Sequence, residues 1–208
     1  MSDGRTTRSF AAGAVAEEMP APEAPPSEPT ATYQDPSGVQ GTGLPIANSD
    51  LVRGSATVVV DAPLPKVRET VLGFADYAEF MPHYQKSKLL GRTPAGARDI
   101  YMEIAAMHGA VKMWARLEVT VKRDGNGPST PSSEGGVETV HMRSVEGNVK
   151  ELSGTWRMEA DGADKTKLTL EVFLSPSLPL PSSVLNAENV KGAVKGVVAM
   201  KKRAEGAR

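Results

Sequence analysis

The sequence predicts an α+β fold, in which an antiparallel sheet of about seven strands curves around one long C-terminal helix. Between residues 86 and 175, six successive segments mostly alternate apolar and polar residues, as half-buried strands do. Glycine, asparagine and aspartate lie between several of these segments, where tight hairpin turns need them. Residues 182–205 instead place apolar side chains at helical spacing. Strands and helices segregated along the chain in this way indicate the α+β class.

The composition changes sharply near residue 50. Residues 1–49 contain seven of the sixteen prolines and few large apolar side chains, so they cannot bury enough surface to offset their chain entropy. We therefore expect residues 1–50 to be a disordered proline-rich segment and residues 51–208 to form one domain. A proline-rich docking peptide is the alternative for the first segment, although it has no clear PxxP motif with flanking basic residues.

The expected domain opens with a strand over residues 55–62, and two short helices follow it over residues 64–74 and 76–81. Asp76 is a candidate N-cap of the second helix, and Pro82 lies beyond its end. Six strands come next, over residues 86–93, 98–107, 110–123, 137–147, 150–161 and 166–175.

The last element is a helix over residues 182–205. Pro181 and Ser182 mark its start, and a Lys/Arg cluster near its end complements the helix dipole. Gly192 and Gly196 each cost about 1 kcal/mol in a helix interior. We expect these glycines either to allow close approach to the sheet or to leave room for something else.

Several classes of function are disfavoured by composition and spacing. The net charge is −1, so no overall field attracts nucleic acid. The chain has no cysteine, its three histidines lack metal-site spacing, and its glycines form no phosphate loop. No apolar run is long enough to span a bilayer. We therefore assign no catalytic residue, metal ligand or cofactor, and we expect no nucleic-acid partner and no transmembrane segment.

The inner face of the predicted sheet carries no charged group. Alternation places apolar side chains on one face of each strand and Lys112, Trp114, Arg116 or Phe173 on the other. Met102, Met113, Met142 and Met158 fall on the inner faces, and methionine suits a deformable apolar lining or an ordinary core. His83 with Tyr84 remains the candidate contact for a ligand's polar end, and a surface histidine is the alternative.

Three segments together carry a family resemblance. They are "VVVDAPLPKVRETVLGFADYAEFMP", "VKELSGTWRMEADGADKTKLTLEV" and "LPLPSSVLNAENVKGAVKGVVAMKKRAE". In this order and spacing, residues 54–205 resemble the START-like (SRPBCC, helix-grip) superfamily, in particular its polyketide cyclase/coenzyme Q-binding branch. The resemblance implies a seven-stranded sheet that grips the last helix over a hydrophobic cavity. It places Tyr77, Phe80, Met81 and Pro82 beside the cavity mouth, and Trp156 on a strand that faces the last helix.

The resulting expectation is a carrier or binding protein for a hydrophobic small molecule, such as a lipid or an isoprenoid quinone. Cavity position and strand alternation together select fifteen residues. The expected ligand-binding residues are Phe80, Met81, His83, Tyr84, Met102, Ile104, Met113, Ala115, Leu117, Met142, Trp156, Leu170, Val172, Val190 and Val194.

Two other functions stay open at this point. A polyketide cyclase or aromatase would need polar groups inside the cavity, for which Tyr101, His141, Arg143 and His83 are the candidates. A protein-interaction module would use residues 1–49 and an outer face that carries Trp114 and Phe173. We expect a cytoplasmic protein, with export as an alternative, while transient membrane contact and the oligomeric state stay open.

Overall fold

The computed structural model of the protein describes residues 31–106, 109, 111–124 and 136–206. Within these residues the chain forms nine strands, three α-helices and one short 3-10 turn. The strands are β1 (Thr32–Gln34), β2 (Gln40–Pro45), β3 (Val52–Val60), β4 (Tyr84–Arg92), β5 (Arg98–Ala106), β6 (Val111–Asp124), β7 (Val137–Gly147), β8 (Val149–Ala160) and β9 (Thr166–Pro176). The helices are α1 (Leu64–Leu72), η1 (Phe74–Asp76), α2 (Tyr77–Phe80) and α3 (Ser182–Glu205).

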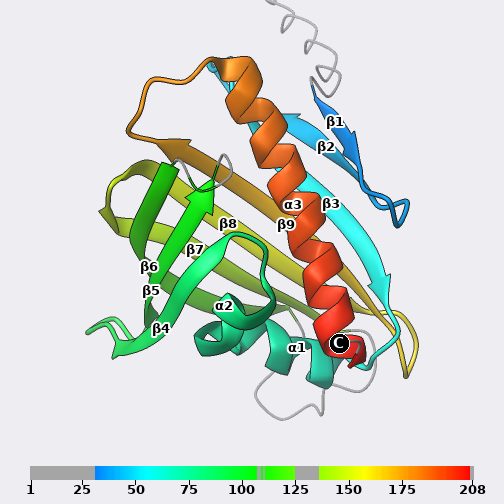
Figure 1. Cartoon of the computed structure of the whole chain (residues 1–208). Helices are drawn as coiled ribbons and strands as arrows, with labels where there is room; N and C mark the ends of the chain where they lie inside the picture. The colour runs from blue at the N-terminus through cyan, green and yellow to red at the C-terminus, as the bar shows by residue number, and fades with distance from the viewer. Residues whose placement is uncertain (1–30, 107–108, 110, 125–135, 207–208) are drawn as a thin grey trace, which may run out of the picture.

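All nine strands belong to one antiparallel sheet, in the order β1-β2-β3-β9-β8-β7-β6-β5-β4. Strands β4 to β9 follow one another as neighbours, and β9 returns to pair with β3. The sheet curves around α3, while α1 and α2 cover one end of it (Figure 1). The predicted α+β helix-grip architecture is therefore confirmed, with a larger sheet than the expected seven strands. No helix in the described part of the chain is long and apolar enough to span a membrane.

The two additional strands come from the segment expected to be disordered, so that expectation is wrong for residues 32–45. Strand β2 pairs with β3 over five residue pairs, and β1 pairs with β2. The turn between them is held by Asp35, whose Oδ1 accepts hydrogen bonds from the backbone N–H groups of Ser37 and Val39, both at 3.0 Å. This hairpin is stabilised by backbone pairing and by close approach at glycines, neither of which produces an apolar sequence pattern. Residues 1–30 lie outside the described residues.

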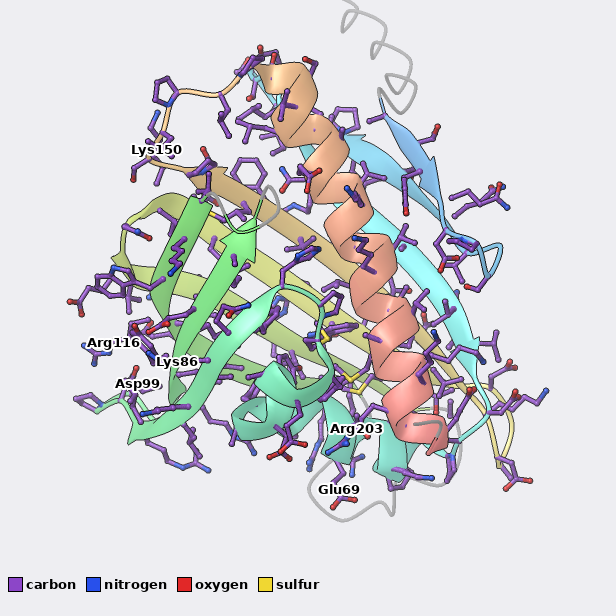
Figure 2. The ribbon with its side chains drawn as sticks, viewed as in Figure 1. Glu69, Lys86, Asp99, Arg116, Lys150 and Arg203 are labelled. Atoms are coloured by element: carbon purple, nitrogen blue, oxygen red, sulfur yellow. The ribbon has the colours of Figure 1, made fainter. Side chains whose placement is uncertain are left out.

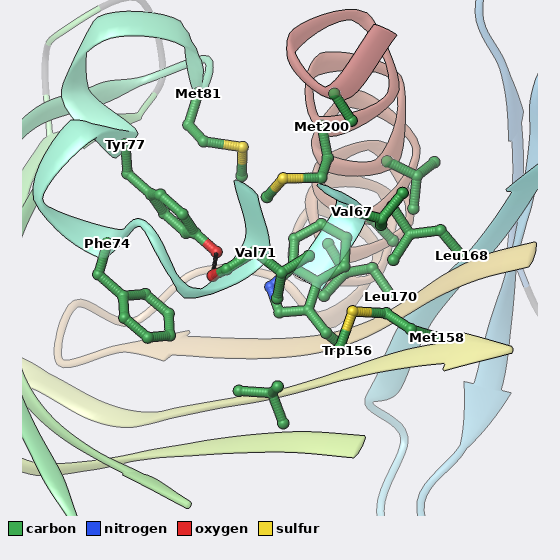
Figure 3. Close-up of a cluster of buried hydrophobic side chains, with 14 of the residues drawn as sticks. Val67, Val71, Phe74, Tyr77, Met81, Trp156, Met158, Leu168, Leu170 and Met200 are labelled. Atoms are coloured by element: carbon green, nitrogen blue, oxygen red, sulfur yellow. Dashed lines mark hydrogen bonds between the residues drawn. The ribbon is translucent and has the colours of Figure 1, made fainter. Parts of the chain in front are cut away.

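The short helices form a compact apolar cluster with the sheet and α3. Figure 3 shows Val67 and Val71 of α1 with Tyr77 and Met81, facing Trp156 on β8. The Tyr77 hydroxyl donates to the carbonyl of Val71 at 2.6 Å, which fixes α2 against α1. Asp76 does precede α2, but its side chain makes no capping hydrogen bond. Its expected role as an N-cap is therefore wrong.

Helix α3 is held on the sheet by an apolar stripe and by one buried amide. The stripe consists of Val190, Ala193, Val194, Val197, Met200 and Ala204, none of which is more than marginally exposed. Asn189 donates from Nδ2 to the carbonyl of Val52 at 3.1 Å and accepts from the N–H of Leu174 at 2.9 Å. A single side chain therefore joins α3 to both β3 and β9. Gly206 ends the helix in the left-handed conformation.

The outer face of the sheet is mostly polar and internally paired. Arg116 binds Asp99 through Nε and Nη2, at 2.8 Å for the shortest contact, and Figure 2 shows these two side chains together. Trp114 is half-buried and stacks on Tyr101 at 6.0 Å between ring centroids. Phe173, expected to be exposed on this face, is only 6% exposed. The expected aromatic surface of Trp114 and Phe173 therefore does not form.

Candidate functional site

A cavity of about 160 Å³ lies between α3, the turn after α2, and strands β5, β6, β8 and β9. Its wall is mainly apolar, with Leu170 and Val172 on β9, Met113 on β6, and Leu152 on β8. Further apolar wall comes from Leu180, which precedes α3, and from Leu185 in the first turn of this helix. The space is mainly apolar, and its volume is close to that of an apolar cavity of about 150 Å³ that binds benzene.

The structure brings seven of the fifteen expected residues to this cavity. They are Met81, His83, Tyr84, Ile104, Met113, Leu170 and Val172. They come from the turn after α2 and from strands β4, β5, β6 and β9. Strand alternation and the family resemblance selected them, together with eight residues that lie elsewhere.

The other eight expected residues lie elsewhere. Six are buried in the packed core and do not line the cavity: Met102, Ala115, Leu117, Trp156, Val190 and Val194. Met142 is half-buried against Gly154, where a Cβ would lie 2.8 Å from its Cε. Phe80 is half-buried beneath Arg203, whose Cζ is 5.3 Å from the ring centroid. None of these eight residues is among those that line the cavity, so the expectation that they do is wrong.

The face of α3 toward the cavity was not selected from the sequence. It presents Glu188, Asn189, Gly192, Lys195 and Gly196. Asn189 lies four residues before Ala193, so it is a polar residue at a position where the helical pattern predicts an apolar one. That break in the pattern could have identified Asn189 from the sequence. Gly192 is the position that leaves space, because the nearest atom to a Cβ built there is 4.0 Å away. At Gly196 a Cβ would lie 2.6 Å from Leu170 Cδ2, so this glycine permits close contact instead.

The cavity has one polar end, formed by His83 and Tyr84 with Lys195 of α3. His83 has a positive φ of 71°, a conformation uncommon for residues other than glycine. Its carbonyl accepts a hydrogen bond from the N–H of Ala105 at 2.8 Å, which ties this turn to β5. The Lys195 Nζ lies 3.4 Å from His83 Nε2. A lysine ammonium has no acceptor capacity, so the imidazole nitrogen that faces it acts as the acceptor.

Burial keeps the two neighbouring tyrosines neutral. Tyr84 packs edge-on against Tyr77, with ring centroids 5.8 Å apart. Burial raises the pKa of Tyr84 to about 12. Burial, and then the proximity of Tyr84, also raise the pKa of Tyr77 well above its usual value. Neither phenol therefore supplies a base near neutral pH, although Tyr84 can serve as a hydroxyl contact at the cavity wall.

The polar residues considered for cyclase chemistry are mostly directed away from the cavity. Tyr101 donates to Glu103 at 2.7 Å, and Arg143 pairs with Glu118 at 2.7 Å, both on the outer face. The His141 ring nitrogen Nδ1 lies 3.2 Å from Thr155 Oγ1 on that same face. Of these four candidates, only His83 lines the cavity.

Comparison with known proteins identifies a family and a fold. The family described as "Polyketide cyclase / dehydrase and lipid transport" matches residues 60–188. A curated set of proteins contains no sequence that matches the chain.

The chain is also similar to several solved structures. A STAR-related lipid transfer protein fragment from Xanthomonas axonopodis is 18% identical, with a TM-score of 0.68 over 84% of this chain and 97% of that chain. The Zhui aromatase/cyclase from Streptomyces sp. R1128 is 20% identical, with a TM-score of 0.53 over 73% of this chain and 92% of that chain. Human StAR-related lipid transfer protein 5 is 13% identical, with a TM-score of 0.66 over 85% and 86% of the two chains. At these identities the similarity shows the fold.

Proposed function

The chain belongs to the polyketide cyclase / dehydrase and lipid transport family, and on that basis we propose that it binds a hydrophobic small molecule in the cavity beside α3. The observation that carries this proposal is the cavity itself, which has a largely apolar wall and one polar end. Apolar enclosure supplies affinity in such sites, while a few placed polar groups fix the orientation of the ligand. The START-like structures that share the fold support this choice.

The cavity volume limits what can be enclosed. An apolar cavity of roughly 150 Å³ accommodates a molecule the size of benzene, and the volume here is about 160 Å³. The enclosed part of the ligand is therefore one ring or a short chain. A complete lipid or an isoprenoid quinone would require the segment before α3 and the first turn of this helix to move outward, and Leu178 and Val184 there are already exposed at 52% and 36%.

Binding without catalysis is favoured by the state of the polar groups. Asn189 uses both its amide atoms to hold β3 and β9, and Glu188 pairs with Lys191 at 3.3 Å. General acid–base catalysis needs a positioned titratable pair within reach of the substrate. A cyclase remains the second candidate, because His83 and Tyr84 both line the cavity.

Native mass spectrometry of protein purified without detergent tests the binding proposal, together with calorimetric titration of 1-octanol. We expect a co-purified hydrophobic molecule or saturable octanol binding. Gly192→Leu fills the cavity from a position that has open space, so this variant should stay folded and lose the binding. A wild-type protein that binds no apolar compound contradicts the proposal. Conversion of a poly-β-ketone substrate that is lost in His83→Asn would favour the cyclase, since asparagine also tolerates the positive φ at this position.

A further inference from the structure

We propose that the molecule held in this cavity carries an anionic head group, which is received by Lys195 beside His83. This inference rests on the proposed function and specifies the chemical class of the ligand. It follows from three observations: the continuity of the cavity with a surface groove, the lack of a counter-ion at Lys195, and the backbone that fixes His83.

The cavity and a shallow groove on the surface share one wall. Pro82, His83 and Lys195 line both spaces. Beyond this wall the groove is bordered by Lys202 and Arg203 of α3, and Figure 2 shows Arg203 at the end of the helix near α2. A molecule whose apolar part fills the cavity would therefore place its other end at Lys195 and direct it into the groove.

In the described part of the chain Lys195 and the more exposed Lys202 have no ion pair, whereas three other cations of α3 do. Lys191 pairs with Glu188 at 3.3 Å, Lys201 with Glu205 at 2.6 Å, and Arg203 with Glu79 at 3.0 Å. In the part of the chain that the structure describes, no carboxylate lies within 4.0 Å of Lys195. Lys195 is half-buried as a residue, and in the described part of the chain the hydrogen bond that its ammonium makes is the exposed contact with the imidazole of His83.

The two acidic side chains of the groove are already engaged. Asp35 Oδ1 accepts the N–H groups of the turn between β1 and β2, and Glu79 pairs with Arg203. Glu188, which lines the cavity, pairs with Lys191, and among the described residues none of these three carboxylates forms an ion pair with Lys195. An anion that reaches the Lys195 ammonium gains a charge-assisted hydrogen bond, which is stronger than a hydrogen bond between neutral groups. Lys202, which also borders the groove, adds a second positive charge and disfavours a cationic head group.

The backbone at His83 fixes the position of the polar end. A positive φ is maintained here by two main-chain hydrogen bonds, from Ala105 N–H to His83 O at 2.8 Å and from Tyr84 N–H to Met81 O at 3.3 Å. Because an outlying backbone conformation costs free energy, its retention at a cavity wall points to a positioning role. His83 thus sets where the Lys195 ammonium lies relative to the cavity.

The ligand class that satisfies these conditions is an amphiphile with a ring or a chain of about eight carbons and one anionic group. A carboxylate can accept hydrogen bonds from Lys195 while its chain occupies the apolar wall. An alcohol of the same length would leave the ammonium without a counter-charge, and an amine would be repelled. Hydrogen bonds to charged groups contribute about 1.5–3 kcal/mol, which corresponds to a preference of about 10-fold or more for the acid over the alcohol.

Three eight-carbon ligands that differ only in head group provide the test: octanoate, 1-octanol and octylamine. Calorimetric titration of the full chain at neutral pH should give the tightest binding for octanoate, about 10-fold weaker binding for octanol, and the weakest for octylamine. In Lys195→Met, octanoate should fall to the level of octanol while octanol binding is retained. Lys122→Met, a matched change on the outer face of β6, should leave all three affinities unchanged, and circular dichroism verifies that both variants fold.

Each other outcome contradicts a defined part of the inference. Equal binding of octanoate and octanol by the wild type, or an acid preference that survives in Lys195→Met, overturns the anionic head group but leaves the proposed function intact. Acetate binding as tight as octanoate shows a site for free anions and overturns the amphiphile. Absence of binding by every ligand, including octanol, overturns the inference together with the proposed function.

Discussion

Glycines on the two sides of α3 have opposite effects on packing: those on β2 and β3 allow close contact with the helix, whereas Gly192 on the helix leaves open space. Toward β2 and β3 the helix touches the sheet backbone, and a Cβ at Gly54 would lie 2.0 Å from the carbonyl oxygen of Asn189. At Gly41 it would lie 2.4 Å from Val194 Cγ2. Toward the cavity, the nearest atom to a Cβ at Gly192 is 4.0 Å away. Glycine thus removes the space on one side of the helix and provides it on the other.

This difference explains why the cavity persists. Packed interiors close over unfilled space where their elements can move. Here α3 cannot shift into the cavity without leaving β3, because Gly54 and Asn189 fix its distance from that strand. The close contact between α3 and β3 therefore keeps the cavity on the other side of the helix open. Substitutions at the glycines on each side test this comparison directly.

The largest expected effect comes from Gly54→Ala. The added methyl group meets a backbone carbonyl rather than a flexible side chain, so either α3 or β3 must move. Overpacking in a core costs about 1–3 kcal/mol and occasionally more, and we expect a loss of about 3 kcal/mol in the free energy of unfolding. Urea denaturation measures this loss. Gly162→Ala, in a turn where no atom lies within 4 Å, is the control for the glycine substitution itself, with a smaller loss from its positive φ of 78°. A Gly54 variant as stable as the wild type would show that the helix is not clamped here.

Asn189→Ala should give the next largest effect. It leaves the N–H of Leu174 and the carbonyl of Val52 without their amide partner, at a site that is 3% exposed. An unsatisfied buried group costs about 1–3 kcal/mol, so we expect a loss of about 2 kcal/mol. Asn186→Ala is the matched control: it removes contacts to Val52 and Asp50 at a more exposed position and should cost about half as much. Equal losses in both variants would contradict a special role for the buried amide.

The contacts of Gly54 and Asn189 also show which features of the structure could be predicted from the sequence. Strand alternation correctly predicted that Leu117 and Trp156 face inward, because a two-residue period is a property of each strand alone. It could not separate core from cavity, since that depends on the distance between α3 and the sheet, which Gly54 and Asn189 set across more than a hundred residues. The β1–β2 hairpin was missed because its stability comes from backbone pairing and small residues. Phe173 was also mispredicted: alternation places it on the outer face, but it is 6% exposed, and its burial cannot be predicted from the pattern of one strand.

Tyr84, at the polar end of the cavity, should make the free energy of unfolding depend on pH above about pH 10. Burial raises the pKa of Tyr84 to about 12, whereas an unfolded tyrosine titrates near 10. The stabilisation from the neutral phenol is therefore complete below about pH 10 and declines as the pH rises toward 12. For this partly exposed ring we expect a loss of about 2 kcal/mol across that range. Urea denaturation at several pH values should show a smaller decline in Tyr84→Phe, where the raised pKa values of Tyr77 and Tyr101 remain. An unchanged decline in Tyr84→Phe would assign the effect to other groups.

The smallest effect is expected at Gly192, and its sign separates the two faces most clearly. Alanine favours a helix interior over glycine by about 1 kcal/mol, and the space at Gly192 accepts a methyl group without contact closer than 4.0 Å. Gly192→Ala should therefore raise the free energy of unfolding by about 1 kcal/mol, while every substitution on the tight face lowers it. Gly196→Ala, one turn later, gains the same propensity but meets Leu170 Cδ2 at 2.6 Å, so its net change should be close to zero or negative. Because Gly192 lines the cavity, its replacement should also weaken octanol binding as stability rises. A helix that becomes more stable as it loses ligand would show that this glycine is kept for the space it leaves.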